Sequence, residues 1–252
     1  MKSVVPFVFK IGLLMLVPAF AHTQDVHFWG VLPTYTQVTP LSKKLDWSFF
    51  FGNAINPSHE HFGTLDFPEA DVRLQLNNAI VYKAQKNLSF AAGMIYQKNF
   101  AFDSRHVDEY RPYQQVLFSH YLSALKVNHR VRFCERFIEN KAAATYPLTT
   151  VLQYNAGFQL PLKGKTIEPK KFYLTGYAEE FFFLSGPNKF SLLGEFWTNA
   201  SLGYNFGSWG RLQSGFTYEW LARNVKKDNR QMFLFSTDLI TNFDLFGVRK
   251  HK

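Results

Sequence analysis

The chain has 252 residues, of which 18% are aromatic and only 19% are charged, and its formal net charge is +9. This composition, with few low-complexity stretches, excludes wholesale disorder. Beyond residue 21 no segment reaches the roughly 18 unbroken apolar residues of a membrane-spanning helix, which excludes a multi-helix membrane protein. The single cysteine, Cys134, excludes an internal disulfide and a cysteine-based zinc or iron–sulfur site.

Residues 1–21 are predicted to be a cleaved secretory signal peptide. Lys2 and Lys10 precede a short apolar run, residues 11–20, and an A-x-A cleavage site ends at Ala21. An anchor helix is the alternative, but the run is too short for one and Pro18 interrupts it. We therefore expect residues 22–252 to form one exported domain.

Beyond residue 25, apolar and polar residues alternate with a period of two, which indicates β-strands. In residues 151–161, for example, Leu152 and Tyr154 lie on one face, and Gln153 and Asn155 lie on the other. The segments predicted as strands are 26–38, 45–53, 70–82, 87–97, 110–121, 126–137, 151–161, 172–183, 196–206, 210–220 and 232–243. Their lengths are close to the roughly 9–11 residues that a tilted strand needs to cross a bilayer.

The composition of the two faces favours a membrane barrel. The apolar faces carry aromatic and aliphatic residues, and the polar faces carry Gly, Asn, Gln, Ser and Arg. This pattern is typical of a transmembrane barrel with a polar lumen and a lipid-facing exterior. A soluble sandwich would alternate too, but its strands are usually nearer 5–6 residues.

The predicted connections alternate between short and long. Tight links fall at 83–86, 122–125 and 206–210, and longer polar links fall at 54–69, 98–109, 138–150, 184–195 and 221–231. Short periplasmic turns and longer external loops are expected of such a barrel. Residues 162–171 are the exception, because this link has a periplasmic place in the order but the length of a loop.

The number of strands is predicted to be 10 or 12. Eleven segments are found, but single-chain bacterial barrels have an even number of strands. Segment 26–38, which Pro33 interrupts, is then an inner strand, a plug or half of a missed hairpin. The fold class expected is an all-β, up-and-down, antiparallel transmembrane β-barrel.

Several motifs, in their order along the chain, resemble the bacterial outer-membrane barrel family called domain of unknown function 2490. They are Phe28-Trp29, the EYRPYQQ segment at 109–115, the HRVRFCERF strand at 129–137, Glu179 to Phe182, and the Gly- and Tyr-rich hairpin at 203–220. The resemblance implies an outer-membrane barrel. It implies no particular activity.

Arginines with a period of two form the most unusual feature. Arg130, Arg132 and Arg136 share one face with Cys134, and we place this face in the lumen. The predicted luminal charge network consists of Arg73, Arg111, Arg130, Arg132, Arg136, Glu179, Glu180, Arg211, Glu219 and Asp238. Only one of the adjacent residues Glu179 and Glu180 can point inward. Asp71 is a further candidate for a luminal carboxylate. Such a set is either an anion-selective constriction or solute site, or a salt-bridge network that fills a narrow lumen.

Aromatic residues form a second set, which we assign to the lipid-facing exterior. Trp47, Trp209 and Trp220 lie near strand ends and are predicted to belong to an interfacial girdle. The residues assigned to the apolar outer surface are Phe49, Phe51, Phe181 and Phe183.

Other chemistry is predicted to be absent. Ser119 and His120 point to opposite faces of a strand and no G-x-S-x-G motif occurs, which argues against a lipid hydrolase. His59 and His61 flank Glu60 in a long loop, and we interpret this as solvated loop and not as a metal site. The basic residues are scattered, so no nucleic-acid partner is expected.

The sequence therefore predicts a barrel in the outer membrane of a Gram-negative bacterium, most simply a narrow pore or transport protein with an arginine-lined lumen. The alternative is a closed structural or envelope-interaction barrel, and a membrane-embedded lipid-modifying hydrolase is a third option. We expect no enzyme activity and no cofactor. The partners expected are outer-membrane lipid, including lipopolysaccharide phosphates near the positive loops, the barrel-assembly machinery, and a small anionic solute.

Overall fold

The computed structural model describes residues 26–62, 65–67, 70–102, 106–187, 189, 191–222 and 229–248. The predicted signal peptide lies outside these residues. For residues 60–62, 65–67, 70 and 71 only the backbone is described. No helix in the described part of the chain is long and apolar enough to cross a membrane.

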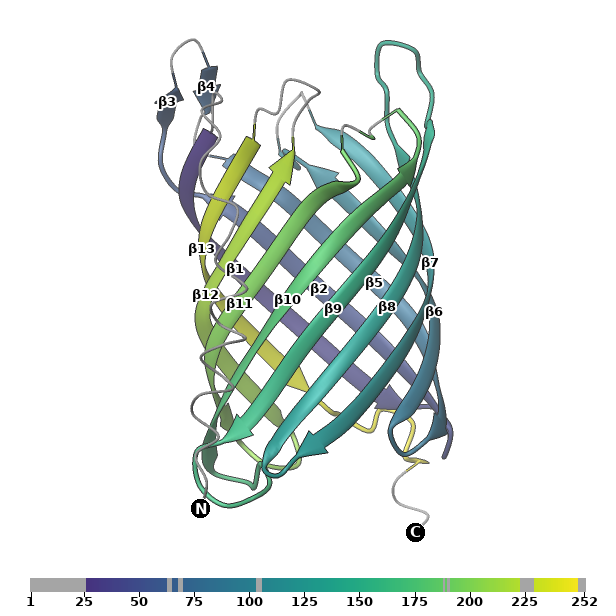
Figure 1. Cartoon of the computed structure of the whole chain (residues 1–252), viewed down its shortest axis with the longest axis vertical. Helices are drawn as coiled ribbons and strands as arrows, with labels where there is room; N and C mark the ends of the chain where they lie inside the picture. Colours follow the sequence, from purple (N-terminus) through teal and green to yellow (C-terminus); the bar gives the residue numbers. More distant parts are fainter. Residues whose placement is uncertain are drawn as a thin grey trace.

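The described residues form a closed barrel of long tilted strands (Figure 1). The barrel strands are β1 (Val26–Pro40), β2 (Leu45–Asn56), β5 (Ala70–Gln85), β6 (Leu88–Asn99), β7 (Val107–Leu122), β8 (Leu125–Ile138), β9 (Leu148–Pro161), β10 (Lys171–Ser185), β11 (Leu193–Asn205), β12 (Gly210–Ala222) and β13 (Asn229–Thr241). A small hairpin of β3 (Glu60–Phe62) and β4 (Leu65–Phe67) rises from the link between β2 and β5.

The barrel has eleven strands in the described chain, so the prediction of 10 or 12 is wrong. All neighbours pair antiparallel except β1 and β13, which run parallel from Val26↔Arg230 to Gln37↔Thr241. This parallel seam lets an odd number of strands close. The register of β1 with β2 skips Leu32 and Pro33. Proline has no N–H to give to that ladder, so it fits where pairing on one side lapses.

Apolar side chains lie outside and polar ones inside, the reverse of a soluble protein. Trp29 and Phe216 are each 63% exposed, whereas Glu109 and Arg111 are 1% and 2% exposed. Such an inversion is what an outer-membrane-type barrel requires, because lipid surrounds its exterior and water or polar groups fill its lumen.

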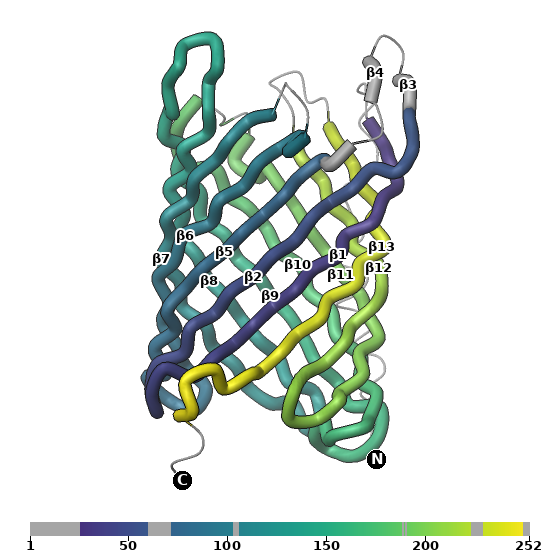
Figure 2. The backbone as a smooth tube through the Cα atoms, turned by 180° about the vertical axis from the view of Figure 1, so that it is seen from behind, coloured from purple at the N-terminus to yellow at the C-terminus, as the bar shows by residue number. Residues whose placement is uncertain are grey.

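The two ends of the barrel differ. The links 41–44, 86–87, 123–124, 162–170 and 206–209 lie at one end together with the end of β13, and we call this the short-turn end. The other connections and the start of β1 lie at the opposite, long-loop end (Figure 2). The predicted alternation of short and long links is therefore found, and the first and last barrel strands begin and end at opposite ends.

The prediction that Phe181 and Phe183 face lipid is wrong. They are 2% and 4% exposed, and they pack with Tyr113, Ile95 and Cys134 inside the barrel. Strands β10 and β8 thus alternate as expected, but part of the luminal face of β10 is aromatic. A guanidinium group stacks on this aromatic surface: the Arg136 guanidinium carbon lies 5.3 Å from the Phe183 ring centroid.

Candidate functional site: the luminal arginine layer

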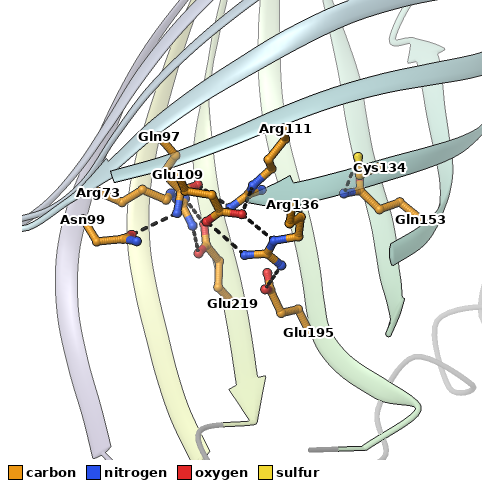
Figure 3. Close-up of polar contacts among 10 residues, drawn as sticks. All are labelled: Arg73, Gln97, Asn99, Glu109, Arg111, Cys134, Arg136, Gln153, Glu195 and Glu219. Atoms are coloured by element: carbon orange, nitrogen blue, oxygen red, sulfur yellow. Dashed lines mark hydrogen bonds and ion pairs between the residues drawn. The ribbon is translucent and has the colours of Figure 1, made fainter. Parts of the chain in front are cut away.

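A chain of buried ion pairs crosses the lumen toward the long-loop end (Figure 3). Glu109 on β7 lies between two arginines: Arg111 Nε and Arg136 Nε both donate to Glu109 Oε1 at 2.5 Å. Arg136 Nη1 also donates to Glu195 Oε1 on β11 at 2.6 Å, and Arg111 Nη2 donates to Gln97 Oε1 at 2.8 Å. The four charged side chains are at most 7% exposed. Charge-assisted bonds of this kind are the strong ones in a water-poor interior.

A second ion pair joins distant strands. Arg73 on β5 donates from Nη1 and Nη2 to the two carboxylate oxygens of Glu219 on β12, at 2.7 and 2.6 Å. The Arg73 guanidinium carbon lies 4.5 Å from the centroid of the Trp197 ring. The bidentate pair and the indole together span the barrel interior between β5, β11 and β12.

Arg130 and Arg132, two residues apart on β8, have different partners. Arg130 Nη2 donates to Glu179 Oε1 at 2.6 Å. Arg132 Nε donates to the Gln115 amide oxygen at 2.8 Å, and its guanidinium carbon lies 4.1 Å from the Tyr113 ring centroid. No described carboxylate forms a hydrogen bond with Arg132. The amide of Gln115 and the ring of Tyr113 hold this cation in place of a counter-charge.

Glycines make room for the aromatic rings beneath the guanidinium groups. A Cβ atom on Gly203 would lie 2.3 Å from Tyr173 Cζ, and one on Gly93 would lie 2.6 Å from the Tyr113 hydroxyl. Three luminal units therefore repeat one arrangement of glycine, ring and arginine: Gly93, Tyr113 and Arg132; Gly203, Tyr173 and Arg211; Gly194, Phe183 and Arg136. Each unit replaces luminal water with a flat ring and a stacked cation.

Two cavities lined by described residues lie inside the barrel, and both reach the arginine layer. The cavity toward the long loops has a volume of about 380 Å³, and the one toward the short turns about 140 Å³. Three side chains, Arg73, Trp197 and Glu219, line both cavities. The ion pair with its stacked indole therefore lies where the two cavities adjoin.

The structure brings most of the predicted luminal charges together. Arg73, Arg111, Arg130, Arg132, Arg136, Glu179 and Glu219 belong to the ion pairs and stacks described above. Asp238 faces the smaller cavity and accepts hydrogen bonds from Thr34 and Thr36, and Arg211 lies over the Tyr173 ring. The side chain of Asp71 lies outside the described part.

Of the two adjacent glutamates in the predicted network, Glu180 does not face the lumen. It pairs in register with Tyr154 and Phe196, and Tyr154 is 37% exposed on the outer face. Because adjacent strand residues point to opposite faces, Glu179 is the luminal member and Glu180 lies outside the network.

Two buried carboxylates of the layer, Glu109 and Glu195, are missing from the predicted network. The sequence segmentation placed both at the ends of loops, but the strands begin earlier, at Val107 and Leu193. The alternation of Glu109 with Arg111 was the signal that could have extended β7 and revealed the ion pair.

Metal-binding groups are not a feature of the described residues. None of their His, Cys, Asp and Glu side chains form a cluster of three or more that could hold a metal ion. The side chains of Glu60 and His61 fall outside the described part. His120 stacks on His129 with ring centroids 5.3 Å apart, which is a contact between parallel rings and not a ligand set.

Comparisons with known proteins identify a family and no activity. A family described as "Protein of unknown function (DUF2490)" matches residues 33–232. A solved structure, "LpxR from Salmonella typhimurium", is similar at 11% sequence identity and a TM-score of 0.44, covering 79% of this chain and 83% of that chain. That likeness is too low to bear on the activity of this chain. No curated protein matches.

Proposed function

The chain belongs to the DUF2490 family of proteins of unknown function, and we propose that it is a closed outer-membrane β-barrel whose lumen is sealed by the arginine–carboxylate layer. The proposal includes export by a signal peptide, residues 1–21, to the outer membrane of a Gram-negative bacterium. An exterior of exposed aromatic and aliphatic side chains around a charged interior supports this location.

One observation carries the sealed lumen: a buried bidentate ion pair stacked on an indole lies where the two cavities adjoin, and we take it as the wall between them. Arg73 and Glu219 are 5% and 2% exposed, and Trp197 closes the space beside them. Breaking such a pair leaves an uncompensated charge in a low-dielectric site, which costs several kcal/mol. Thermal motion alone therefore opens this wall rarely.

An anion-conducting pore is the second candidate. It needs guanidinium groups free to replace the hydration shell of a passing ion. Arg130 and Arg136 are engaged by Glu179, Glu109 and Glu195. Arg132 is the buried luminal arginine of this strand with no described carboxylate partner, and this observation supports the pore candidate.

The experiment is single-channel conductance of the refolded protein, residues 22–252, in a planar bilayer. Insertion is verified by the heat-sensitive gel mobility of folded barrels. We expect no steady current from the wild type. The double variant Arg73→Ser with Glu219→Ser removes the wall without stranding a charge, and we expect it to join the two cavities and to conduct.

The control variant is Glu180→Gln, which changes a carboxylate on the outer face and should stay silent. A steady, anion-preferring current from inserted wild-type protein would overturn the sealed barrel. In that case Arg132→Glu should reverse the ion preference, and the pore would become the function.

We also propose that the protein has no enzyme activity and no cofactor. A separate experiment tests for lipid-modifying activity. Lipid A and phospholipid masses should be the same in cells with and without the gene. A changed lipid mass that the re-introduced protein restores would make a lipid-modifying activity the better conclusion.

A further inference from the structure

Lysine and arginine gather at the short-turn end of the barrel. The basic residues there are Lys43, Lys44, Lys83, Lys86, Lys126, Lys163, Lys165, Lys170, Lys171 and Arg211, and the carboxylates there are Asp46, Glu168 and Asp244. Asp46 already accepts from Lys83 Nζ at 2.7 Å. In the described part of the chain, basic residues therefore outnumber carboxylates at this end of the barrel.

Three of these cations belong to the mouth of the lumen. Lys171 lies two residues before Tyr173 and so on the same inward face of β10. Arg211 lies over the Tyr173 ring, with its guanidinium carbon 5.8 Å from the centroid. Lys126 occupies the face of β8 that carries Arg130 and Arg132, and it is near enough to Arg211 for the two charges to repel.

The register brings two of the mouth cations, Lys171 and Arg211, to one level. Lys171 pairs with Asn205, and Asn205 pairs with Arg211, so these residues are directly opposite on three adjacent strands. Strands in a sheet are about 4.8 Å apart, which places the two cationic side chains two strand spacings from each other. Long flexible side chains at that separation can converge on one anionic group.

The long turn completes the mouth. Residues 162–170 fold against the end of β11: Lys170 N donates to Asn205 O at 2.6 Å, and Asn205 Nδ2 donates to Ile167 O at 3.3 Å. The turn, which carries the exposed residues Lys163, Lys165 and Lys170, is thereby held against the strand that separates Lys171 from Arg211. The turn that was the exception in length is thus the one that adds lysines here.

The mouth differs from the arginine layer in its counter-charges. In the layer, buried Arg73, Arg111, Arg130 and Arg136 each bond a glutamate. At the mouth no described carboxylate bonds Lys126, Lys171 or Arg211. The inward carboxylate of Asp238 accepts hydrogen bonds from Thr34 and Thr36 instead. Asp238 pairs in register with Gln213, and Gln213 donates a hydrogen bond to the Tyr173 hydroxyl.

We propose that the cationic mouth, formed by Lys126, Lys171, Arg211 and the lysines of turn 162–170, binds a phosphate-bearing anion at the short-turn end of the barrel. Cations from separate strands lie there, no described carboxylate bonds Lys126, Lys171 or Arg211, and a multivalent anion would relieve their mutual repulsion. Arginine matches a phosphate with two parallel N–H donors, and lysine ammonium groups add point charges around it. The phosphate belongs either to a soluble molecule or to the headgroup of an anionic lipid.

The test separates these two sources. Binding of inorganic tripolyphosphate to the folded full-length protein in a non-ionic detergent is measured by titration calorimetry. In parallel, the thermal stability of the protein is compared in nanodiscs of phosphatidylcholine with and without phosphatidylglycerol. Tripolyphosphate binding without a lipid effect identifies a soluble ligand, and stabilisation by phosphatidylglycerol without tripolyphosphate binding identifies the headgroup.

The critical variant is Lys126→Gln with Arg211→Gln. Loss of two charge-assisted contacts should weaken binding of the effective probe by about tenfold or more. The matched control is Lys43→Gln with Lys86→Gln, which removes the same charge from exposed turns at the same end, and it should bind within about twofold of wild type.

The proposal is overturned if neither probe acts on the wild type, or if both double variants lose binding equally, since that reports only the charge of the whole end. Should the Lys126 and Arg211 variant fail to fold, Lys170→Gln with Lys171→Gln is measured against the same control. These positions lie in the turn and at the first residue of β10, so they change the mouth without touching the Tyr173 ring. Unchanged binding in that variant overturns the proposal as well.

Discussion

Arg73 and Glu219 show at the residue scale why the lumen is both charged and closed. Each is almost fully buried and has the other as its bidentate partner. We expect Glu219→Gln to lower the free energy of unfolding by about 3 kcal/mol, because it leaves a buried guanidinium without its counter-charge. The measurement is urea unfolding of the protein in lipid vesicles, followed by tryptophan fluorescence.

Glu180→Gln is the matched control for that loss. It makes the same chemical change on the outer face of β10, where Glu180 has no described ion pair. We expect no loss of stability, because removing a lipid-facing charge does not strand a partner. An equal loss in the two variants would contradict the assignment of Glu219 to a paired, stabilising role.

Residue-level prediction from the sequence succeeded where alternation alone decides the face. The period of two placed Arg130, Arg132 and Arg136 on one side of their strand, and all three lie in the lumen. It could not choose their partners. Glu195 bonds Arg136 across 59 residues of chain, and only the closed barrel brings β8 and β11 to face each other.

The adjacent pair Glu179 and Glu180 shows a second limit of the pattern. One of the two had to face inward, but the sequence gives no local reason for which. The register of β10 with β9 and β11 decides it, because Glu180 lies opposite Tyr154 and Phe196. Likewise, Phe181 and Phe183 read as lipid-facing, since the pattern does not reveal that arginines stack on rings inside the lumen.

At the scale of elements, strand β1 shows what the sequence can and cannot predict. Its alternation is visible in the sequence, and it makes the number of predicted strand segments eleven. The general preference of bacterial barrels for an even number of strands argues against that number. The parallel pairing of β1 with β13 joins residues more than 200 positions apart, and nothing local in Val26–Pro40 announces it.

A disulfide across the seam tests this element directly. Val31 and Phe235 pair in register, and both are outward, at 37% and 48% exposure. Neighbouring strands are about 4.8 Å apart, which lies within the Cα separation a disulfide accepts. We expect Val31→Cys with Phe235→Cys to cross-link on mild oxidation, read as a shift in gel mobility.

The control for the seam pairs Val31→Cys with Phe216→Cys, one strand further away. Phe216 lies opposite Phe235 on β12, so its Cα is about two strand spacings from Val31 and beyond disulfide reach. Native Cys134 is fully buried and should not react. A ten-stranded barrel with residues 26–38 as a plug predicts no cross-link in the first variant, and that result would refute the seam.

At the scale of the whole molecule, the odd number of strands separates the two ends of the barrel sequence. Because β1 runs parallel to β13, β1 begins at the long-loop end and β13 finishes at the short-turn end. An even, up-and-down barrel would instead start and finish at the same end. The strand count is therefore also a statement about which side of the membrane each end occupies.

Labelling on intact cells decides between these arrangements. In our proposal the long loops face outward, so a membrane-impermeant maleimide should label His27→Cys, at the exposed start of β1, as well as Lys141→Cys in a long loop. Lys86→Cys, in a short turn, should react only after the outer membrane is permeabilised. Labelling of His27→Cys together with Lys86→Cys would place the start of β1 at the short-turn end and require an even barrel. Labelling of Lys86→Cys before Lys141→Cys would invert the barrel, and the cationic mouth would then face the cell exterior.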